Sequence, residues 1–345
     1  MNEISNNQDY TELMNAFYAN DIKRFVNLIE NGANINSIDR FGETVLGSLM
    51  RRYHGLFKTR NFFDILLKNG ASLKQIGLEQ GLLSMAANYH NNDYYLKKLL
   101  NNNINIDDFG VWKRAPGCHY NCYESALLTA IGKCNNDFIN LLLKHKPDMN
   151  IETHQGETVM NHLIISYCTR QKHNDLLPNI KKLLKYGADP EAIGRFGFRA
   201  IHYLSIFNCN ISLFEILIKN NINIDSKDSS KQTALKIAAS NRNYKLSKFL
   251  IENGADIKIA VDMGYSPLIH ENFKIFKLFY DNGLDLLKID DNNNNLLHLI
   301  AKGISEGHIK GGGMEFKKYY EKISKLHPKL LDIKNSKGLT PSDIL

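Results

Sequence analysis

The chain has 345 residues, of which 43% are hydrophobic and 23% charged, and its formal net charge is +7. This composition is typical of folded soluble proteins and excludes a wholly disordered chain. No apolar run approaches the roughly 18 residues that a membrane-spanning helix needs. The N-terminal sequence has neither a basic region nor an apolar segment, so it is not a cleavable signal peptide.

The cysteines are few, odd in number and irregularly spaced: Cys118, Cys122, Cys134, Cys168 and Cys209. This usage argues against a disulfide framework and for a reducing compartment. We therefore expect the protein to work in a cytosol, either its own or that of a host cell. The positive charge permits an acidic partner, but it is spread over a long chain and is weak evidence for nucleic-acid binding.

One segment, Leu-Ile-Glu-Asn-Gly-Ala-Asn-Ile-Asn at 28–36, recurs along the chain. Close copies lie at 66–73, 183–189 and 250–257, and looser copies at 99–106, 142–149, 217–224 and 279–285. The apolar pair that opens each copy predicts the buried side of a helix facing a neighbouring unit. The glycine of Asn-Gly-Ala predicts the left-handed residue that ends this helix, and the polar stretch after it predicts a turn.

A second element precedes these segments. It reads Gly-Glu-Thr-Val-Leu at 42–46, and further copies lie at 156–160, 197–202, 232–239, 264–268 and 338–341. Its threonine predicts a helix cap, and a proline in the next position fixes φ for the first helical turn. The apolar anchor of this element falls at Leu13, Leu46, Leu83, Leu127, Met160, Ile201, Leu235, Leu268 and Leu297, and a further copy starts at Ser342.

These two phased elements resemble the ankyrin signature Thr-Pro-Leu-His-x-Ala, whose period is about 33 residues. The resemblance covers 10–345 and implies an all-α ankyrin-repeat solenoid, with about nine helix-turn-helix units and a partial last one joined by β-hairpin-like loops. It places His202 and His298 at the signature histidine, whose ring normally bonds the hairpin backbone. We expect one domain over 1–345, with an N-terminal cap at about 10–36 and the partial unit at 336–345.

Insertions interrupt the period at about 51–61, 107–122, 166–178 and 303–314. Insertions in repeat proteins usually map to loops on one face, which is often the binding face. The glycines at 311–313 predict a loop. No strand precedes them and no Lys-Ser/Thr pair follows, so they do not match a phosphate-binding loop.

The expected hairpin tips carry aromatic and basic residues. Arg-Phe-Gly occurs twice, Tyr265 follows the equivalent glycine of another unit, and the insertion at 107–122 holds the only tryptophan. Arginine and aromatic residues are enriched at binding hot spots. We therefore predict that the following residues bind a partner protein on the concave face: Arg40, Phe41, Trp112, Lys113, Arg114, Arg195, Phe196 and Tyr265. The alternative is that Phe41 and Phe196 pack onto their own hairpins.

Two groups of residues suggest chemistry. Cys118, His119 and Cys122 form the densest potential zinc site, but no second Cys/His pair lies nearby, so a loop with incidental thiols is the plainer interpretation. A cysteine–histidine nucleophile has candidate residues, but no segment outside the repeats is large enough for a catalytic domain. We therefore expect no enzyme activity, no metal and no cofactor.

The function that fits these observations is a monomeric protein–protein interaction scaffold whose partner has an acidic surface. The Asn-, Lys- and Ile-rich sequence resembles ankyrin proteins of intracellular bacteria or large DNA viruses. That resemblance implies an effector, such as a secreted bacterial one, that acts in virulence on a host protein in the host cytosol. The alternatives are the targeting half of a longer enzyme with a catalytic domain beyond Leu345, a cysteine-dependent enzyme, and nucleic-acid binding by a basic groove.

Overall fold

The computed structural model describes residues 2–40, 42–52, 57–73, 81–89, 93–108, 110–112, 122–260, 273–305 and 313–345. The chain forms two compact units, Met1–Asp189 and Pro190–Leu345. Within the described ranges its regular elements are helices apart from isolated bridges and one short antiparallel strand pair, so the predicted all-α ankyrin architecture is confirmed.

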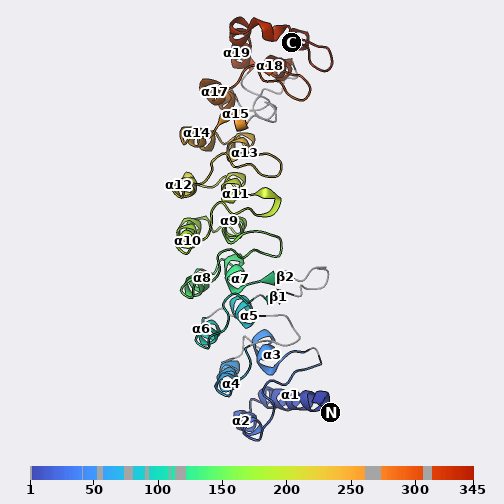
Figure 1. The fold of residues 1–345 in the computed structure, drawn as a ribbon, viewed down its shortest axis with the longest axis vertical. Helices are drawn as coiled ribbons and strands as arrows, with labels where there is room; N and C mark the ends of the chain where they lie inside the picture. The colour runs from blue at the N-terminus through green and yellow to red at the C-terminus, as the bar shows by residue number, and fades with distance from the viewer. Residues whose placement is uncertain are drawn as a thin grey trace. The chain divides into compact units, whose positions relative to one another are not determined.

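In the first unit, a first helix and a second helix alternate along the chain. The first helices are α1 (Asn2–Tyr18), α3 (Val45–Arg52), α5 (Leu82–Tyr89), α7 (Ala126–Gly132) and α9 (Val159–Thr169). The second helices are α2 (Ile22–Glu30), α4 (Phe57–Lys68), α6 (Tyr94–Leu100), α8 (Asn136–Leu143) and α10 (His173–Lys185). Strands β1 (Gly110–Trp112) and β2 (Cys122–Glu124) pair antiparallel within the insertion region at 107–122. Successive first helices stack on one another, and the strands project from them on the side away from the second helices (Figure 1).

The second unit repeats this arrangement. Its first helices are α11 (Ala200–Ile206), α13 (Ala234–Ser240), α18 (Leu296–Ser305) and α20 (Pro341–Ile344). Its second helices are α12 (Ile211–Lys219), α14 (Tyr244–Glu252), α17 (Phe273–Asp281) and α19 (Gly313–Leu326). The short elements η1 (Arg195–Gly197), α15 (Ile257–Ala260) and η2 (Pro328–Leu331) complete it.

The apolar anchors of the second sequence element form the core of the stacked first helices. Each of these anchors lies in a first helix with at most 1% of its surface exposed: Leu13, Leu46, Leu83, Leu127, Met160, Ile201, Leu235 and Leu297. Leu268 lies outside the described residues, and Ser342 lies in α20. The predicted threonine caps are present as well, since Thr158 and Thr233 each accept a backbone N–H of their helix at 3.2 Å.

The second helices end at a residue with positive φ, as the Asn-Gly-Ala motif predicts. Every copy of the motif has this conformation, at Gly32, Gly70, Asn103, Lys146, Gly187, Asn221, Gly254 and Gly283, with φ between 53° and 93°. Glycine adopts positive φ without steric cost because it has no Cβ, whereas Lys146 adopts it against a clash between Cβ and the backbone.

Substitutions at two copies of this position are expected to change stability in opposite directions. Lys146→Gly should raise the free energy of unfolding by about 1 kcal/mol, because it removes the Cβ clash at the cost of a more flexible unfolded chain. Gly254→Ala should lower the free energy of unfolding by about 1 kcal/mol, because it adds a Cβ at a position with positive φ. Urea titration followed by circular dichroism measures both, and shifts of the same sign would contradict the account.

The turns that follow the second helices are bonded to the next repeat. Asn36 Oδ1 accepts the backbone N–H of Ser72 at 2.7 Å, and Asp107 Oδ1 accepts that of Asp148 at 3.0 Å. In the second unit, the carboxylate of Asp225 accepts the N–H of Asp256 at 3.0 Å. These equivalent bonds fix one repeat against the next and so set the spacing of the hairpins.

Candidate partner-binding surface

A shared hydrogen-bond pattern shapes the hairpins between repeats. In the hairpin at 225–233, the backbone N–H of Asp228 donates to Gln232 O at 3.0 Å. Asp228 Oδ1 in turn accepts the N–H groups of Ser230 and Gln232, both at 2.8 Å. Asp290 and Asn335 make equivalent bonds in their own hairpins. An acceptor side chain at this position therefore holds the tip of the turn.

The hairpin at 190–199 departs from this pattern because Gly194 occupies the acceptor position and has no side chain. Its tip instead closes with the N–H of Phe198 donating to Arg195 O at 3.1 Å. Phe196 has φ 56° and ψ 23°, and Gly197 has φ 73°. Two successive residues with positive φ are the geometry of a type I′ turn. Phenylalanine is rarely found there, and such a conformation costs on the order of 1–3 kcal/mol.

This turn presents an apolar and basic tip to solvent. Phe196 is 60% exposed and Ile193 is 57% exposed. The guanidinium of Arg195 lies 4.4 Å from the centre of the Phe196 ring, which is the distance of a cation–π contact. The ring also lies edge-on to Phe198 of its own hairpin, with the ring centres 6.5 Å apart, but most of its surface stays exposed.

Aromatic rings continue from the tip along α11. Phe198 and Tyr203 have ring centres 5.1 Å apart, and Tyr203 stacks on Phe207 at 6.5 Å. We refer to Ile193, Arg195, Phe196, Phe198, Tyr203 and Phe207 as the aromatic surface. The sequence prediction named only Arg195 and Phe196 of these. The sequence does contain one signal for the other residues of this surface. The i, i+4 spacing of Tyr203 and Phe207 places their rings on the same side of a helix.

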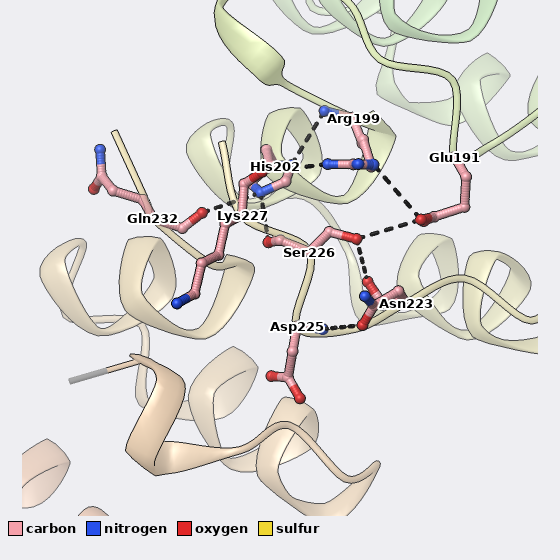
Figure 2. Close-up of polar contacts among 8 residues, drawn as sticks. All are labelled: Glu191, Arg199, His202, Asn223, Asp225, Ser226, Lys227 and Gln232. Atoms are coloured by element: carbon pink, nitrogen blue, oxygen red, sulfur yellow. Dashed lines mark hydrogen bonds and ion pairs between the residues drawn. The ribbon is translucent and has the colours of Figure 1, made fainter. Parts of the chain in front are cut away.

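His202 bonds this surface to the following hairpin, as the ankyrin signature implies. Its Nδ1 accepts the backbone N–H of Arg199 at 3.1 Å. Its Nε2 therefore carries the proton and lies 2.9 Å from Ser226 O and 3.2 Å from Gln232 O (Figure 2). Burial lowers the pKa of His202, which keeps the ring neutral in this role. His298 makes the matching bond from Nε2 to Leu339 O at 3.0 Å.

Arg199 replaces the capping threonine of this repeat and makes a second link between hairpins. Its Nη1 donates to Lys227 O at 3.3 Å, and its Nε lies 3.6 Å from Glu191 Oε2. Ser226 Oγ donates to Asn223 O at 2.7 Å and lies 3.3 Å from the same carboxylate oxygen (Figure 2). These contacts, together with the bond from Ser229 N to Phe196 O at 2.9 Å, hold the aromatic surface on a fixed support.

The geometry of the tip predicts opposite effects for two substitutions at the acceptor position. Gly194→Asp should supply the missing acceptor, release Phe196 from positive φ and raise the free energy of unfolding by about 1 kcal/mol. Asp228→Gly should lower it by about 1 kcal/mol by leaving the tip N–H groups without this acceptor. Urea unfolding gives the energies, and the three-bond amide coupling constant of Phe196 reports its φ. An unchanged coupling in Gly194→Asp would refute this explanation of the turn.

A cavity of about 410 Å³ lies in the first unit beside α7, α9 and the hairpin at 152–158. Its lining includes Asn88, Thr129, Lys133, His162 and Arg170. This cavity is not predictable from the sequence because its lining residues come from separated segments. His162 Nε2 lies 3.1 Å from Leu128 O, and burial lowers the pKa of this ring from 6.5 to about 4.

The neutral His162 ring predicts acid-sensitive stability. Its pKa is lower in the folded chain than in the unfolded chain, so the unfolded state takes up its proton first as the pH falls. The contribution is complete above about pH 6.5 and is lost between about pH 6.5 and 4, with a slope of up to about 1.4 kcal/mol per pH unit. Urea unfolding across this range should show a shallower slope for His162→Gln, and equal slopes in variant and parent would contradict the assignment.

The other predicted site residues are placed only in part. Arg40 is exposed next to its hairpin tip, and Trp112 is described only as the end of β1. Phe41, Lys113, Arg114 and Tyr265 lie outside the described residues, as do Cys118 and His119. Cys122 is described only as the start of β2.

The cysteines whose side chains are described are buried or half-buried. Cys134 donates its thiol to Ser166 O at 3.6 Å, and burial raises its pKa, the reverse of what an activated nucleophile needs. Cys168 and Cys209 are buried. Among the residues with described positions, no cluster of three or more His, Cys, Asp or Glu side chains is arranged to hold a metal ion. Nor does any helix in these ranges have the length and apolar character to cross a bilayer.

Comparisons with known proteins point to one family. A family model of ankyrin repeats in three copies matches residues 165–261. An ankyrin repeat protein of Variola virus is 26% identical over 288 residues, which are 81% of this chain and 48% of the relative. A putative ankyrin repeat protein of Acanthamoeba polyphaga mimivirus is 26% identical over 155 residues, 44% of this chain and 19% of the relative. The chain thus spans about half the length of the first relative and less of the second.

A solved structure agrees with this fold. The ankyrin repeat domain of Bcl-3 superimposes with a TM-score of 0.51 at 20% identity, covering 70% of this chain and 97% of that domain. Because the identity is only 20%, this match is evidence for the fold alone. No enzyme family was found in these comparisons.

Proposed function

The chain is an ankyrin-repeat protein, and from that premise we propose that it binds another protein along the hairpin side of its first helices. Ankyrin repeats typically act as protein-binding scaffolds and are generally not catalytic. The observation that carries the proposal is the aromatic surface of the second unit.

Phe196 is the centre of the proposed contact. It combines 60% exposure, a positive φ and a cation–π contact with Arg195, none of which contributes to the core. A strained and exposed aromatic residue on a fixed support is typical of a binding residue, because it brings large apolar area at little entropic cost. Arg195 beside the ring favours a partner with an acidic group near its apolar contact.

The setting we propose is the cytosol of an infected cell. The sequence resembles ankyrin proteins of both intracellular bacteria and large DNA viruses. The relatives in Variola virus and mimivirus support a viral source. On this proposal the partner is a host protein, and the chain acts as an effector in virulence by occupying it.

Photo-crosslinking from single positions tests the proposed surface. A benzoylphenylalanine placed at Phe196 or at Tyr203 should crosslink the same protein from host-cell lysate, identified by mass spectrometry. The matched control is Tyr244, which is 38% exposed but lies on the second helix α14. The proposal requires this species to be absent from the control reaction.

With the crosslinked partner purified, Phe196→Asn should weaken binding at least about thirtyfold, since hot-spot residues contribute roughly 2 kcal/mol or more. The same substitution should not lower the thermal midpoint, because asparagine tolerates positive φ better than phenylalanine. Unchanged affinity, or the same crosslinked species from Tyr244, would refute the proposed surface.

A further inference from the structure

Asparagine side chains cap the ends of the second helices in six repeats. In each of them the side-chain amide donates to the backbone carbonyl four residues earlier, at 2.7–2.8 Å. The bond ties the side chain to the last turn of its helix. The residues that share it are Asn31, Asn69, Asn102, Asn220, Asn253 and Asn282.

Glycine follows the asparagine in four of these repeats, and both residues of each pair are exposed to solvent. The pairs are Asn31-Gly32, Asn69-Gly70, Asn253-Gly254 and Asn282-Gly283. An asparagine in this context is open to deamidation, because glycine has no side chain to hinder attack by its backbone nitrogen. That nitrogen bonds to the side-chain Cγ, and ammonia leaves with the amide proton. Water then opens the cyclic imide at either carbonyl and leaves aspartate or isoaspartate.

The folded repeats hold the reacting groups apart. Ring closure needs the glycine nitrogen next to the asparagine Cβ, because the imide ring contains Cα, Cβ and Cγ of the asparagine. The ψ angles of Asn31 and Asn253 are 14° and 15°, so the glycine nitrogen instead eclipses the asparagine's own backbone nitrogen. The N–H groups of all four glycines also donate to carbonyls of the preceding helical turn, at 3.0–3.4 Å.

We propose that these four Asn-Gly bonds are modification sites, which deamidate only when the end of a second helix opens locally. Opening frees ψ of the asparagine and the N–H of the glycine, and both are needed for ring closure. The product has a carboxylate in place of the amide, so it loses the donor that caps the helix. Its negative charge also lies at the negative end of the helix dipole. Each modified repeat therefore closes less well than before.

Peptide mass spectrometry of the full chain tests the proposal. Folded protein incubated in neutral buffer should form product at the four sites at least about tenfold more slowly than protein unfolded in guanidinium chloride, since a slow reaction of the open state tracks its population. Asn102 and Asn220 are internal controls, because they make the same bond but are followed by asparagine. Equal rates in folded and unfolded protein, or the fastest product at these two controls, would overturn the proposal.

The variant Gly254→Ala separates the ring chemistry from stability. Its added Cβ should slow product formation at Asn253 at least about tenfold in the unfolded chain, while Asn31 reacts at the parent rate. Because this substitution also weakens the end of the helix, less product at Asn253 in the folded variant could not come from a tighter fold. Unchanged product at Asn253 would refute attack by the glycine nitrogen.

The effect of the product on the cap is measured with Asn253→Asp, which reproduces one outcome of deamidation. Amide hydrogen exchange at the end of α14 should become about threefold faster, because the donor is lost and a like charge meets the helix dipole. The matched control Ser230→Asp adds the same charge to an exposed hairpin residue and should leave this exchange unchanged. Equal effects of the two variants, or no effect of Asn253→Asp, would overturn the claim that deamidation weakens the repeat.

Discussion

The structure depends on stacking, because a single helix pair cannot bury both of its faces. The rings of Phe17 and Phe25 illustrate this in the first unit, where they pack edge-on against Phe62 of the next repeat at 5.1 and 4.8 Å. In the second unit, Phe276 and Phe316 of successive repeats pack with tilted rings whose centres lie 5.3 Å apart. Since the stacked helices carry most of the stability, the exposed tips of the hairpins have no role in the core.

The absence of a core role explains how one hairpin can carry a strained residue. Most of the hairpins described hold their tips with an acceptor side chain, as Asp228 does. Where Gly194 removes the acceptor, the chain turns through positive φ at Phe196 and exposes the ring. Hydrogen bonds from His202 and Arg199 to the backbone of the following hairpin hold this geometry. Positive φ at Phe196 costs free energy only at this turn, and the packing of the stacked helices offsets that cost.

The sequence predicted the repeated part of this fold well, but it did not predict the turn at Phe196 or the cavity of the first unit. The anchors from Leu13 to Leu297 were assigned from their spacing because stacking imposes the same burial on every repeat. The turn at Phe196 was not predictable from the motif, since it follows from an acceptor that is missing at Gly194. The cavity was missed because its lining residues, such as Thr129 and Arg170, are far apart in the sequence and meet only where two repeats pack together.

The central claim is that the hairpin side of the first helices, and not the second helices, contacts the partner. Hydrogen–deuterium exchange of the chain with and without its purified partner measures this directly. We predict that binding slows exchange in the hairpins at 190–199 and 225–233 and at the exposed end of α11, and leaves α12 and α14 unchanged. Protection confined to α12 and α14, with no change at 190–199, would contradict the account.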